Sequence, residues 1–377
     1  MKISLTAFTD RGEALALKIT EQLHTDGEQA AFVRCGRRHL PMRSEPADYN
    51  EKGVFDTGSD TYGRAADWTA EHFGESDALI FVGAAGIAVR QIAPHIVRKT
   101  TDPAVVVIDE AGRFVIPILS GHLGGANALA SYLASLTGGQ AVITTATDVN
   151  GVFAFDDWAR RMNCGVENVE LIREVSGALL AGETVSVCSD FEITGGMPRG
   201  VIYGSFAEAS VHITIRDEQH AILCANARGD DGEPASTRNI KERKLRIIPR
   251  VVCAGIGCRR GTSAGEIEHA VMEACRENGI SPKALNAFAS IDLKAEEEGI
   301  KEFARKYRVP FLTFSAEELR DVPGEFTGSE FVRSVTGVDN VCERAASIFG
   351  ELICRKKAWG SVTVALALGR PALSFEL

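Results

Sequence analysis

The chain has 377 residues, which allows two or three domains, and its 45% hydrophobic and 24% charged content is that of an ordinary globular protein. Its 41 Lys and Arg residues are outnumbered by 51 Asp and Glu residues, giving a formal net charge of -10. Nucleic-acid binders usually carry a basic balance or a basic stripe, so we expect no nucleic-acid partner. We interpret the dense basic run at residues 241–250 as part of a linker.

The longest apolar run, residues 78–89, is interrupted by two glycines and is shorter than the roughly 20 residues that a membrane-spanning helix needs. The first residues, MKISLTAF, have a strand pattern and no apolar core typical of a signal peptide. The nine cysteines are scattered, odd in number and without a Cys-x-x-Cys pair, which indicates free thiols. We therefore expect a cytoplasmic protein with no membrane partner.

Residues 1–150 alternate between strand-like and helix-like patterns. Apolar runs typical of strands occur at residues 3–9, 30–36, 78–82, 104–108, 114–119 and 141–145. Patterns typical of helices occur at residues 12–24, 64–74, 87–96 and 126–136. Residues 37–63 are polar and are expected to form a loop, and residues 110–112 are expected to form a hairpin turn. Pro117 places its strand at a sheet edge or at a bulge.

The rest of the chain changes texture twice. Residues 151–226 combine two helical patterns, at 153–163 and 167–181, with short strands at 184–189 and 211–216. Residues 227–246 are polar and contain Gly and Pro, as linkers do. The last part contains strand patterns at 251–255, 284–290 and 310–314, helical patterns at 263–278, 295–307 and 328–349, and a final hairpin ending near residue 368.

The predicted fold class is α/β. We expect a mostly parallel sheet in an N-terminal unit (1–150), a small α+β middle domain (151–226), a linker (227–246) and a second α/β domain at the C-terminus (247–377). Two pairs of residues have the spacing of a capping box at a helix start, namely Ser263 with Glu266 and Thr327 with Glu330.

A polar, glycine-rich segment follows the strand 114–119 and contains Ser120, Gly121, His122, Gly124, Gly125 and Asn127. Its glycines allow a close approach to a ligand, and the N-terminus of the following helix favours an anion there. His122 is a candidate general acid or base, and Ser120 is a candidate nucleophile or proton carrier. The structural alternative is a glycine turn in which Asn127 caps the helix and His122 bonds to the backbone.

A second polar segment follows the run 141–145 and contains Thr144, Thr145, Thr147, Asp148 and Asn150. Its side chains are candidates to orient a polar substrate or a water molecule, and Asp148 is a candidate base. The structural alternative is a turn held by its own hydroxyl and carboxylate groups. Both segments follow strands of the predicted parallel sheet, where ligands bind at the carboxyl ends.

Two further glycine turns carry arginines. The first contains Gly83, Gly86 and Arg90, and the second contains Gly257, Arg259, Arg260, Thr262 and Ser263. Neither has the G-x-G-x-x-G spacing of a dinucleotide-binding loop, but each is a candidate to bind acidic groups of a substrate. The alternative is that these cations form ordinary exposed surfaces.

Five segments together resemble the cobalt-precorrin-5A hydrolase family (CbiG type) of the anaerobic cobalamin pathway. They are GAAGIAVRQIAP, DPAVVVIDEAGRFVIPILSGHLGGANALA, VITTATDVNG, GIGCRRGTS and SEFVRSVTGV, which span about residues 78–150 and 251–345. The first 50 residues and the middle domain carry little of the resemblance. Pro117 is a departure, since we expect a small polar residue there in the family.

The resemblance implies a substrate that is a cobalt-bearing, ring-contracted tetrapyrrole with a δ-lactone on its ring-A acetate. Water opens the lactone, and a two-carbon unit leaves as acetaldehyde to give cobalt-precorrin-5B. No cofactor and no protein-bound metal are implied, because the substrate carries the cobalt. Neighbouring enzymes of the pathway are candidate partners, and a homodimer is a candidate assembly.

From these residues we hypothesise that His122 or Asp148 activates the water and that backbone N–H groups of residues 124–127 stabilise the oxyanion. Arg90, Arg259 and Arg260 would hold substrate carboxylates, in a cleft between the N-terminal and C-terminal units. A rival interpretation is a carrier that binds the tetrapyrrole without reacting. A nucleotide-dependent methyltransferase is a weaker alternative, because the glycine spacing is wrong for it.

Overall fold

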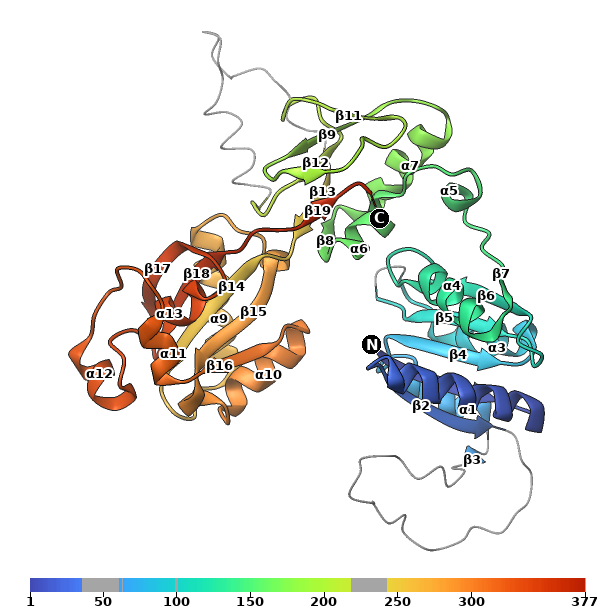
Figure 1. Cartoon of the computed structure of the whole chain (residues 1–377), viewed down its shortest axis with the longest axis horizontal. Helices are drawn as coiled ribbons and strands as arrows, with labels where there is room; N and C mark the ends of the chain where they lie inside the picture. Colours follow the sequence, from blue (N-terminus) through green and yellow to red (C-terminus); the bar gives the residue numbers. More distant parts are fainter. Residues whose placement is uncertain (36–60, 63, 99–100, 218–242, 377) are drawn as a thin grey trace, which may run out of the picture. The chain divides into compact units, whose positions relative to one another are not determined.

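The computed structural model describes residues 1–35, 61–62, 64–98, 101–217 and 243–376 (Figure 1). The chain divides into two compact units, residues 1–160 and 161–377. The first unit includes residues 151–160, which the sequence assigned to the middle domain. Most of the expected loop at 37–63 and of the expected linker at 227–246 lies outside the described residues, and Thr61–Tyr62 of that loop form a short strand instead. No helix in the described ranges combines the length and hydropathy needed to cross a bilayer.

The first unit is built on a seven-stranded sheet of order β3-β2-β1-β4-β5-β6-β7. Its strands are β1 (Lys2–Ala7), β2 (Gln29–Cys35), β3 (Thr61–Tyr62), β4 (Ala78–Val82), β5 (Ala104–Ile108), β6 (Phe114–Leu119) and β7 (Gln140–Ala141). Every neighbouring pair is parallel except β5–β6, which form the hairpin expected at residues 110–112. The prediction of a mostly parallel sheet is confirmed.

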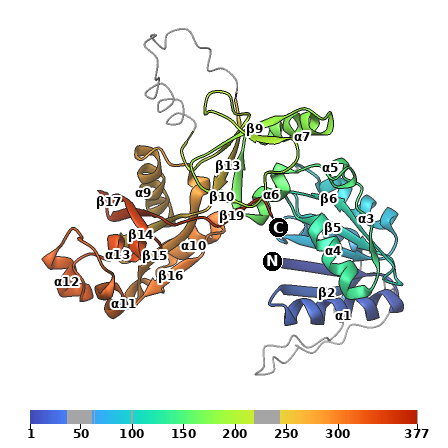
Figure 2. The same ribbon diagram turned by 45° about the horizontal axis from the view of Figure 1, so that its top comes forward.

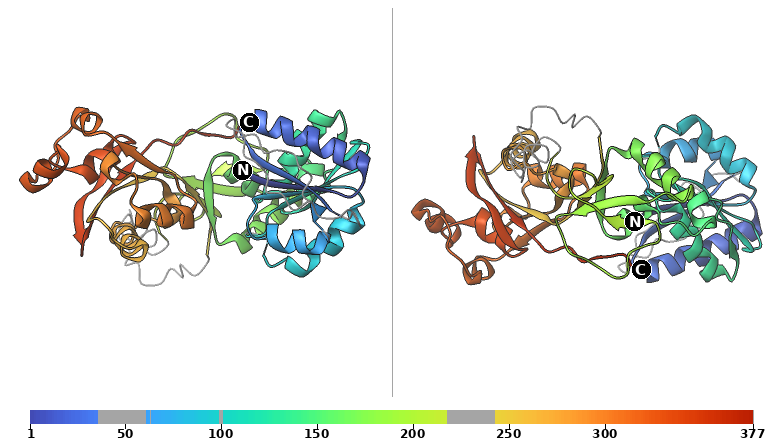
Figure 3. Two further views of the ribbon diagram at one scale, coloured as in Figure 1. Left: turned by 90° about the horizontal axis from the view of Figure 1, so that it is seen from below. Right: turned by 90° about the horizontal axis from the view of Figure 1, so that it is seen from above.

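Helices cover both faces of this sheet. They are α1 (Asp10–Thr25), α2 (Ala65–His72), α3 (Ala85–Ile92) with the 3₁₀ turn η1 (Ala93–His95), and α4 (Ala126–Thr137). The short helices α5 (Ala146–Val149) and α6 (Phe155–Arg161) follow β7 in the chain. Apolar residues of α1 and α4 pack with Ile80 of β4, whereas those of α2 and α3 pack with Leu79 and Phe81 of the same strand. Because side chains alternate along a strand, β4 supplies both cores. Figure 3 shows α1 and the pair α2–α3 on opposite sides of the sheet.

The strand β6 carries Pro117 next to a bulge. Pro117 lies opposite Val106, where the register of β5 and β6 shifts, and β7 pairs only with the first two residues of β6. A proline cannot donate to a sheet ladder, so the bulge accommodates it. The bulge half of the prediction is therefore confirmed.

The expected strand at 141–145 is wrong. After β7 the N–H of Val142 still bonds to Val115, but the chain then turns at Thr145 into the single-turn helix α5. The polar side chains of this segment bond to the loop after β6 rather than to a sheet neighbour, as described below, and this tertiary demand outweighs strand propensity.

The second unit contains two five-stranded sheets, seen in Figure 2. The first has the order β11-β9-β12-β13-β8, and its strands are β8 (Cys164–Glu167), β9 (Val185–Ser189), β11 (Val201–Tyr203), β12 (Val211–Ile213) and β13 (Leu245–Pro249). The 3₁₀ turn η2 (Val169–Leu171) leads into the helix α7 (Ile172–Leu180). The short strand β10 (Ile193–Thr194) pairs with β19 (Leu373–Ser374) near the end of the chain.

The strand β13 corrects the interpretation of the basic run as linker. Its five residues are buried, and it pairs with β12 on one side and β8 on the other. Leu245, Ile247 and Ile248 supply the apolar surface of a central strand, and the buried Arg246 forms an ion pair with Glu167 at 2.7 Å. The charged residues around positions 245–249 made the strand difficult to recognise from the sequence. Pairing with β8 and β12 stabilises it in the fold.

The second sheet of this unit has the order β16-β15-β14-β18-β17. Its strands are β14 (Val252–Cys258), β15 (Leu285–Ile291), β16 (Phe311–Phe314), β17 (Glu351–Trp359) and β18 (Val362–Leu368). The accompanying helices and 3₁₀ turns are α9 (Ala264–Glu277), η3 (Pro282–Ala284), η4 (Asp292–Lys294), α10 (Glu298–Tyr307), α11 (Ala316–Asp321), α12 (Glu330–Thr336) and α13 (Val341–Ser347). The capping box of Ser263 and Glu266 and the final hairpin are confirmed.

The long helix expected at 328–349 is wrong, because two helices occupy this range. Gly337, with φ of 79°, ends α12 in the left-handed region, and Asn340 caps α13. Thr327 is not a cap either: Ser329 caps α12, while the N–H and hydroxyl of Thr327 both donate to the buried carboxylate of Glu343. The apolar periodicity of the sequence continues through residues 337–340, although Gly337 ends one helix there and Asn340 begins the next.

Candidate functional site

The site in the first unit is centred on His122, whose imidazole lies between two carboxylates. Its Nε2 is 2.8 Å from Oδ2 of Asp148, and its Nδ1 is 3.1 Å from Oδ1 of Asp156. The three groups come from three segments: His122 lies in the loop after β6, Asp148 in the helix α5 and Asp156 in the helix α6. Asp156 is buried, with 1% of its side chain exposed, whereas 36% of the Asp148 side chain is exposed. One carboxylate is therefore internal and the other faces solvent.

The two carboxylates set the charge of the ring. Burial by itself lowers the pKa of His122, but hydrogen bonds and charge interactions with Asp156 and Asp148 outweigh it and raise the pKa to about 9. At neutral pH the ring is therefore an imidazolium that donates both N–H groups. In this state His122 is a proton donor and not a base.

Asn127 and two threonines complete the network around Asp148. The Nδ2 of Asn127 donates to Oγ1 of Thr145 at 2.9 Å and to Oδ2 of Asp148 at 3.1 Å. The hydroxyl of Thr147 lies 3.5 Å from Nε2 of His122. The structural alternative for Asn127, a helix cap, is wrong, since Gly125 occupies the cap position of α4 in the left-handed region. Both predicted polar segments thus contribute to one cluster.

The turn before α4 is closely packed. Ser120 is buried, and its hydroxyl donates to the carbonyl of Asp102 at 3.0 Å rather than to His122. A Cβ on Gly121 would lie 2.7 Å from Oδ1 of Asn127, and a Cβ on Gly124 would lie 2.4 Å from Cβ of Ser120. These glycines allow the turn to close on itself and to place Asn127 beside Asp148.

The expectation that the amides of residues 124–127 bind an oxyanion is wrong for three of the four. The N–H of Gly125 donates to the carbonyl of His122 at 2.9 Å, and that of Ala126 donates to Ser120 at 3.1 Å. The N–H of Asn127 donates to Gly121 at 3.0 Å. These three donors hold the turn together, so at most the N–H of Gly124 remains for an oxyanion near this site.

The helix α6 supplies residues that the sequence analysis missed. Besides Asp156 it carries Arg160, whose Cδ, Nε and Nη1 lie 3.5–3.7 Å from the position that a Cβ on Gly125 would take. Arg160 donates to Asp157 at 3.0 Å, and its buried Nε has no hydrogen-bond partner within the described ranges. The signal in the sequence was the pair of acids in FDDWARR directly after the Thr-Asp segment, but acids at a helix start usually serve the helix itself.

Other predicted residues of the first unit lie outside this cluster. Thr144 is exposed, and Nδ2 of Asn150 donates to the carbonyl of Ala146, which closes α5. Gly83 follows β4 and packs against Phe8, Gly86 belongs to α3, and Arg90 of the same helix is exposed. These residues have no contact with His122 among the interactions of the described residues.

In the second unit, the turn after β14 is occupied by groups of the chain itself. Ser263 accepts from the N–H of Glu266, and the hydroxyl of Thr262 donates to the carbonyl of Arg259. The N–H of Gly261 donates at 2.6 Å to Glu297, whose pKa lies below its ordinary value because hydrogen bonds from Lys294 and Gly261 outweigh its burial.

The cations of that turn remain accessible. Arg259 and Arg260 are exposed, whereas Gly257 lies within β14 beside Thr363. An internal carboxylate thus already takes the backbone donor expected for an external anion, and the two arginine side chains are left as the groups available to a ligand.

Comparison with known proteins places the chain in a family. The model of the family described as Cobalamin synthesis G N-terminal matches residues 67–148, and that described as Cobalamin synthesis G C-terminus matches residues 252–367. A solved cobalamin biosynthesis protein G homologue from Sulfolobus solfataricus is 21% identical, with a TM-score of 0.39 over 97% of this chain and 96% of that one.

Two curated relatives cover most of the chain. The cobalt-precorrin-5A hydrolase of Salmonella typhimurium is 38% identical over 314 residues, which are 81% of this chain and 86% of the relative. The cobalt-precorrin-5A hydrolase of Priestia megaterium is 35% identical over 301 residues, which are 77% of this chain and 78% of the relative. Since both matched models and both relatives agree, the chain belongs to the cobalt-precorrin-5A hydrolase family.

Proposed function

We propose that this chain hydrolyses cobalt-precorrin-5A to cobalt-precorrin-5B and acetaldehyde. The relatives' names supply the reaction, and their coverage of the chain supports its transfer. The observation that carries the site is the imidazolium of His122 held between buried Asp156 and solvent-facing Asp148. The contact between Asp148 and His122 supports a mechanism in which a carboxylate acts as the base and the neighbouring imidazolium acts as the acid.

The reaction needs three kinds of help. Water adds to the lactone carbonyl, which leaves the ring-A acetate as a carboxylate and a hydroxyl on the two-carbon unit. That hydroxyl then loses its proton, the bond to the macrocycle breaks and acetaldehyde departs, while the electron pair and a proton go to the macrocycle carbon. The steps require a base, a donor for the oxyanion and an acid.

Asp148 is our candidate for the base. Its Oδ2 accepts hydrogen bonds from His122 and Asn127, which fix the carboxylate, and its partial exposure lets a water molecule reach it. The choice that the sequence left open between His122 and Asp148 falls on Asp148, because a protonated imidazole cannot accept a proton.

His122 is our candidate for the acid, with Asp156 as the group that positions it. The N–H at Nδ1 is held by Asp156, so the ring is fixed while Nε2 faces Asp148. Arg160 is our candidate for the oxyanion donor, since three of the four neighbouring backbone amides are taken and its guanidinium lies against Gly125. Ser120 has its hydroxyl committed to Asp102 and receives no chemical role.

The rest of the proposal concerns the substrate. The exposed arginines Arg90, Arg259 and Arg260 are candidates to meet carboxylates at the edge of the macrocycle. We assign no resident metal or cofactor a part in the reaction, because the cobalt arrives in the substrate. We expect the protein to act in the cytoplasm, with neighbouring pathway enzymes or a second copy as candidate partners.

The test is acetaldehyde release from cobalt-precorrin-5A by the purified full chain, followed together with the mass of the tetrapyrrole. We expect acetaldehyde and loss of the two-carbon unit, and we expect Asp148→Asn to lower kcat about 100-fold or more, as removal of a general base does. Asn150→Ala, at an exposed position of the same segment, is the matched control and should keep kcat within about twofold. Tight binding of unchanged substrate would identify a carrier and overturn the hydrolase.

A further inference from the structure

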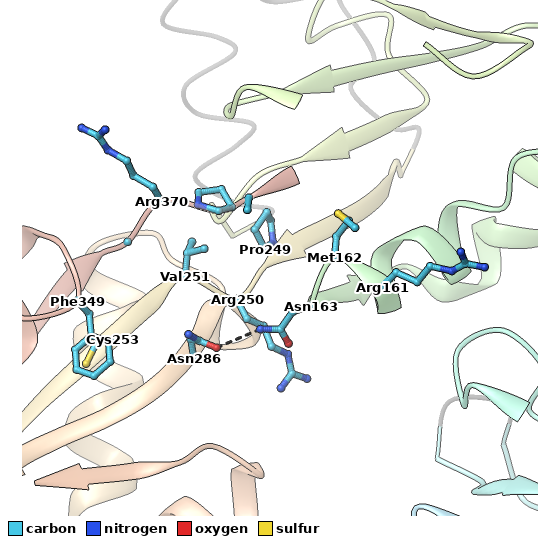
Figure 4. Close-up of a pocket in the computed structure, with 13 residues that line it drawn as sticks. Arg161, Met162, Asn163, Pro249, Arg250, Val251, Cys253, Asn286, Phe349 and Arg370 are labelled. Carbon is cyan, nitrogen blue, oxygen red and sulfur yellow. Dashed lines mark hydrogen bonds between the residues drawn. The ribbon is translucent and has the colours of Figure 1, made fainter. Parts of the chain in front are cut away.

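A cavity of about 380 Å³ lies wholly within the second unit, apart from the His122 site, which belongs to the first (Figure 4). It is bounded by the ends of β13, β14 and β15 and by residues 369–372 after β18. Its volume falls within the range of small-molecule sites. Nothing in the catalytic argument uses it.

The cavity is unusual in its charge. Three arginines line it, Arg161, Arg250 and Arg370, and none of the described residues that line it is acidic. Neither Arg250 nor Arg370 has an ion-pair partner among the described residues. In a chain with a formal net charge of -10, the positive charges of Arg250 and Arg370 can attract an anion to this cavity.

The rim of the cavity is held in place by the backbone. The N–H of Arg250 donates to the carbonyl of Asn163 at 3.2 Å, and Nδ2 of Asn163 donates to Oδ1 of Asn286 at 3.2 Å. Asn163 adopts φ of 51°, a left-handed conformation that asparagine tolerates better than most residues. The two amides and the stem of Arg250 are therefore fixed before any ligand arrives.

The side chains of Arg250 and Arg370 extend from that fixed rim. Figure 4 shows the side chains of Arg161, Arg250 and Arg370 extending in different directions. Long arginine stems can swing so that several guanidinium groups meet one polyanion, and their planar fork suits carboxylates.

The remaining wall is apolar, which indicates an organic ligand rather than a bare inorganic ion. It includes Val251, Phe349 and Pro371, together with the buried Cys253. Burial raises the pKa of the Cys253 thiol, so it is neutral and adds to the apolar surface.

We propose that this cavity binds a carboxylate-bearing organic anion through Arg250 and Arg370, with the apolar wall against its carbon skeleton. Two sources share this chemistry: the edge of the tetrapyrrole substrate or product, or a free polycarboxylate metabolite. The first source rests on the proposed function, whereas the second does not.

The experiment uses the full chain and the variants Arg250→Gln, Arg370→Gln and their combination. The control is Arg199→Gln, which removes the same charge from an exposed position of the same unit outside the cavity. Calorimetric titration with tricarballylate and with inorganic phosphate measures binding, and steady-state turnover gives KM and kcat for cobalt-precorrin-5A. Thermal unfolding of each variant checks its fold, and Arg250→Lys tests for partial rescue.

If the tetrapyrrole is the source, the double variant raises KM about tenfold or more, while kcat stays within about twofold. If a free polycarboxylate is the source, tricarballylate binds the parent chain more tightly than phosphate, and the double variant weakens it about tenfold with KM unchanged. Equal KM and equal tricarballylate binding in the double variant and Arg199→Gln would overturn the inference. A chain that releases no acetaldehyde but binds tricarballylate through both arginines would instead refute only the proposed function.

Discussion

At the scale of single residues, the informative feature is a histidine whose two nitrogens both face carboxylates. Removal of either carboxylate partner changes the charge state as well as the position of the ring. Asp156 is nearly inaccessible to solvent, whereas Asp148 is partly exposed, so the two aspartates that contact His122 differ in what can reach them. Burial separates the positioning group from the group that can meet substrate.

This arrangement predicts a pH-dependent stability. The pKa of folded His122, about 9, lies above its ordinary value of 6.5, so the stabilisation is complete below pH 6.5 and is lost as the pH rises through 9. The full shift corresponds to about 3 kcal/mol. We expect the parent chain to have a higher free energy of unfolding than His122→Gln at pH 6, and a smaller difference between the two at pH 9.5. Denaturant unfolding at both pH values measures this difference.

A second histidine provides a control of opposite sign. Burial lowers the pKa of His212 to about 4, although a hydrogen bond to the carbonyl of Phe206 opposes the change. The contribution of His212 to the free energy of unfolding is therefore present above pH 6.5 and is lost as the pH falls through 4. His212→Gln should change the acid side of the stability profile and leave the interval from pH 7 to 9.5 alone. If the difference in free energy of unfolding between the parent chain and His122→Gln did not depend on pH, the assignment of His122 as an imidazolium would be contradicted.

Arg160 gives the second prediction at this scale. If its guanidinium stabilises the oxyanion, Arg160→Gln should lower kcat about 100-fold with a small change in KM, as loss of an oxyanion donor does. Arg160→Lys keeps the charge without the fork and should recover part of kcat. Steady-state kinetics measures both, and unfolding checks the fold. If Gln and Lys lower kcat and stability together and equally, Arg160 is only a structural partner of Asp157.

At the scale of elements, helix starts and buried strands follow from local patterns, whereas breaks depend on distant groups. The range 328–349 illustrates this, because it holds two helices with a turn between them. Thr327, which precedes α12, donates two hydrogen bonds to Glu343 of α13. Asn340 supports the same turn, since its side chain accepts from the N–H of Glu343 and donates to the carbonyl of Thr327. No local sequence pattern shows that Glu343 and Asn340 both contact Thr327.

Asn340→Ala should therefore destabilise the second unit more than an ordinary cap loss does. It removes a helix cap formed by a buried side chain, worth about 1 kcal/mol, and also removes the hydrogen bond to the carbonyl of Thr327, at a further cost of about 0.5–1.5 kcal/mol. Ser329→Ala, at a partly buried cap with a 3.4 Å bond, is the matched control and should cost about 1 kcal/mol or less. Thermal or denaturant unfolding measures the difference, and equal losses would show that the turn does not depend on Asn340.

At the scale of the whole molecule, an acidic chain is proposed to bind a polyanion. Attraction must then come from local groups of arginines, such as Arg259 with Arg260 and Arg250 with Arg370, rather than from the overall charge. Such contacts are screened by salt.

We expect KM for cobalt-precorrin-5A to rise severalfold as KCl increases from about 0.05 to about 0.5 M, because screening over this range shortens the Debye length to a few ångströms. The kcat should change little, since the acid and base act after binding. Turnover measured across this range is the check, with a neutral osmolyte of equal osmolality as the control. A KM that stays constant would contradict ionic recognition of the substrate.

The sequence by itself determined the strand-helix alternation, the mostly parallel sheet and the segments that hold His122, Asp148 and Asn127, because periodicity, glycine turns and caps are local properties of the chain. Tertiary structure decided the rest. It brought Asp156 and Arg160 close to His122, raised the pKa of His122 by placing carboxylates on both of its sides, and used within the turn backbone amides that were expected to bind an anion. Charge state and donor availability depend on through-space neighbours, which spacing along a chain does not encode.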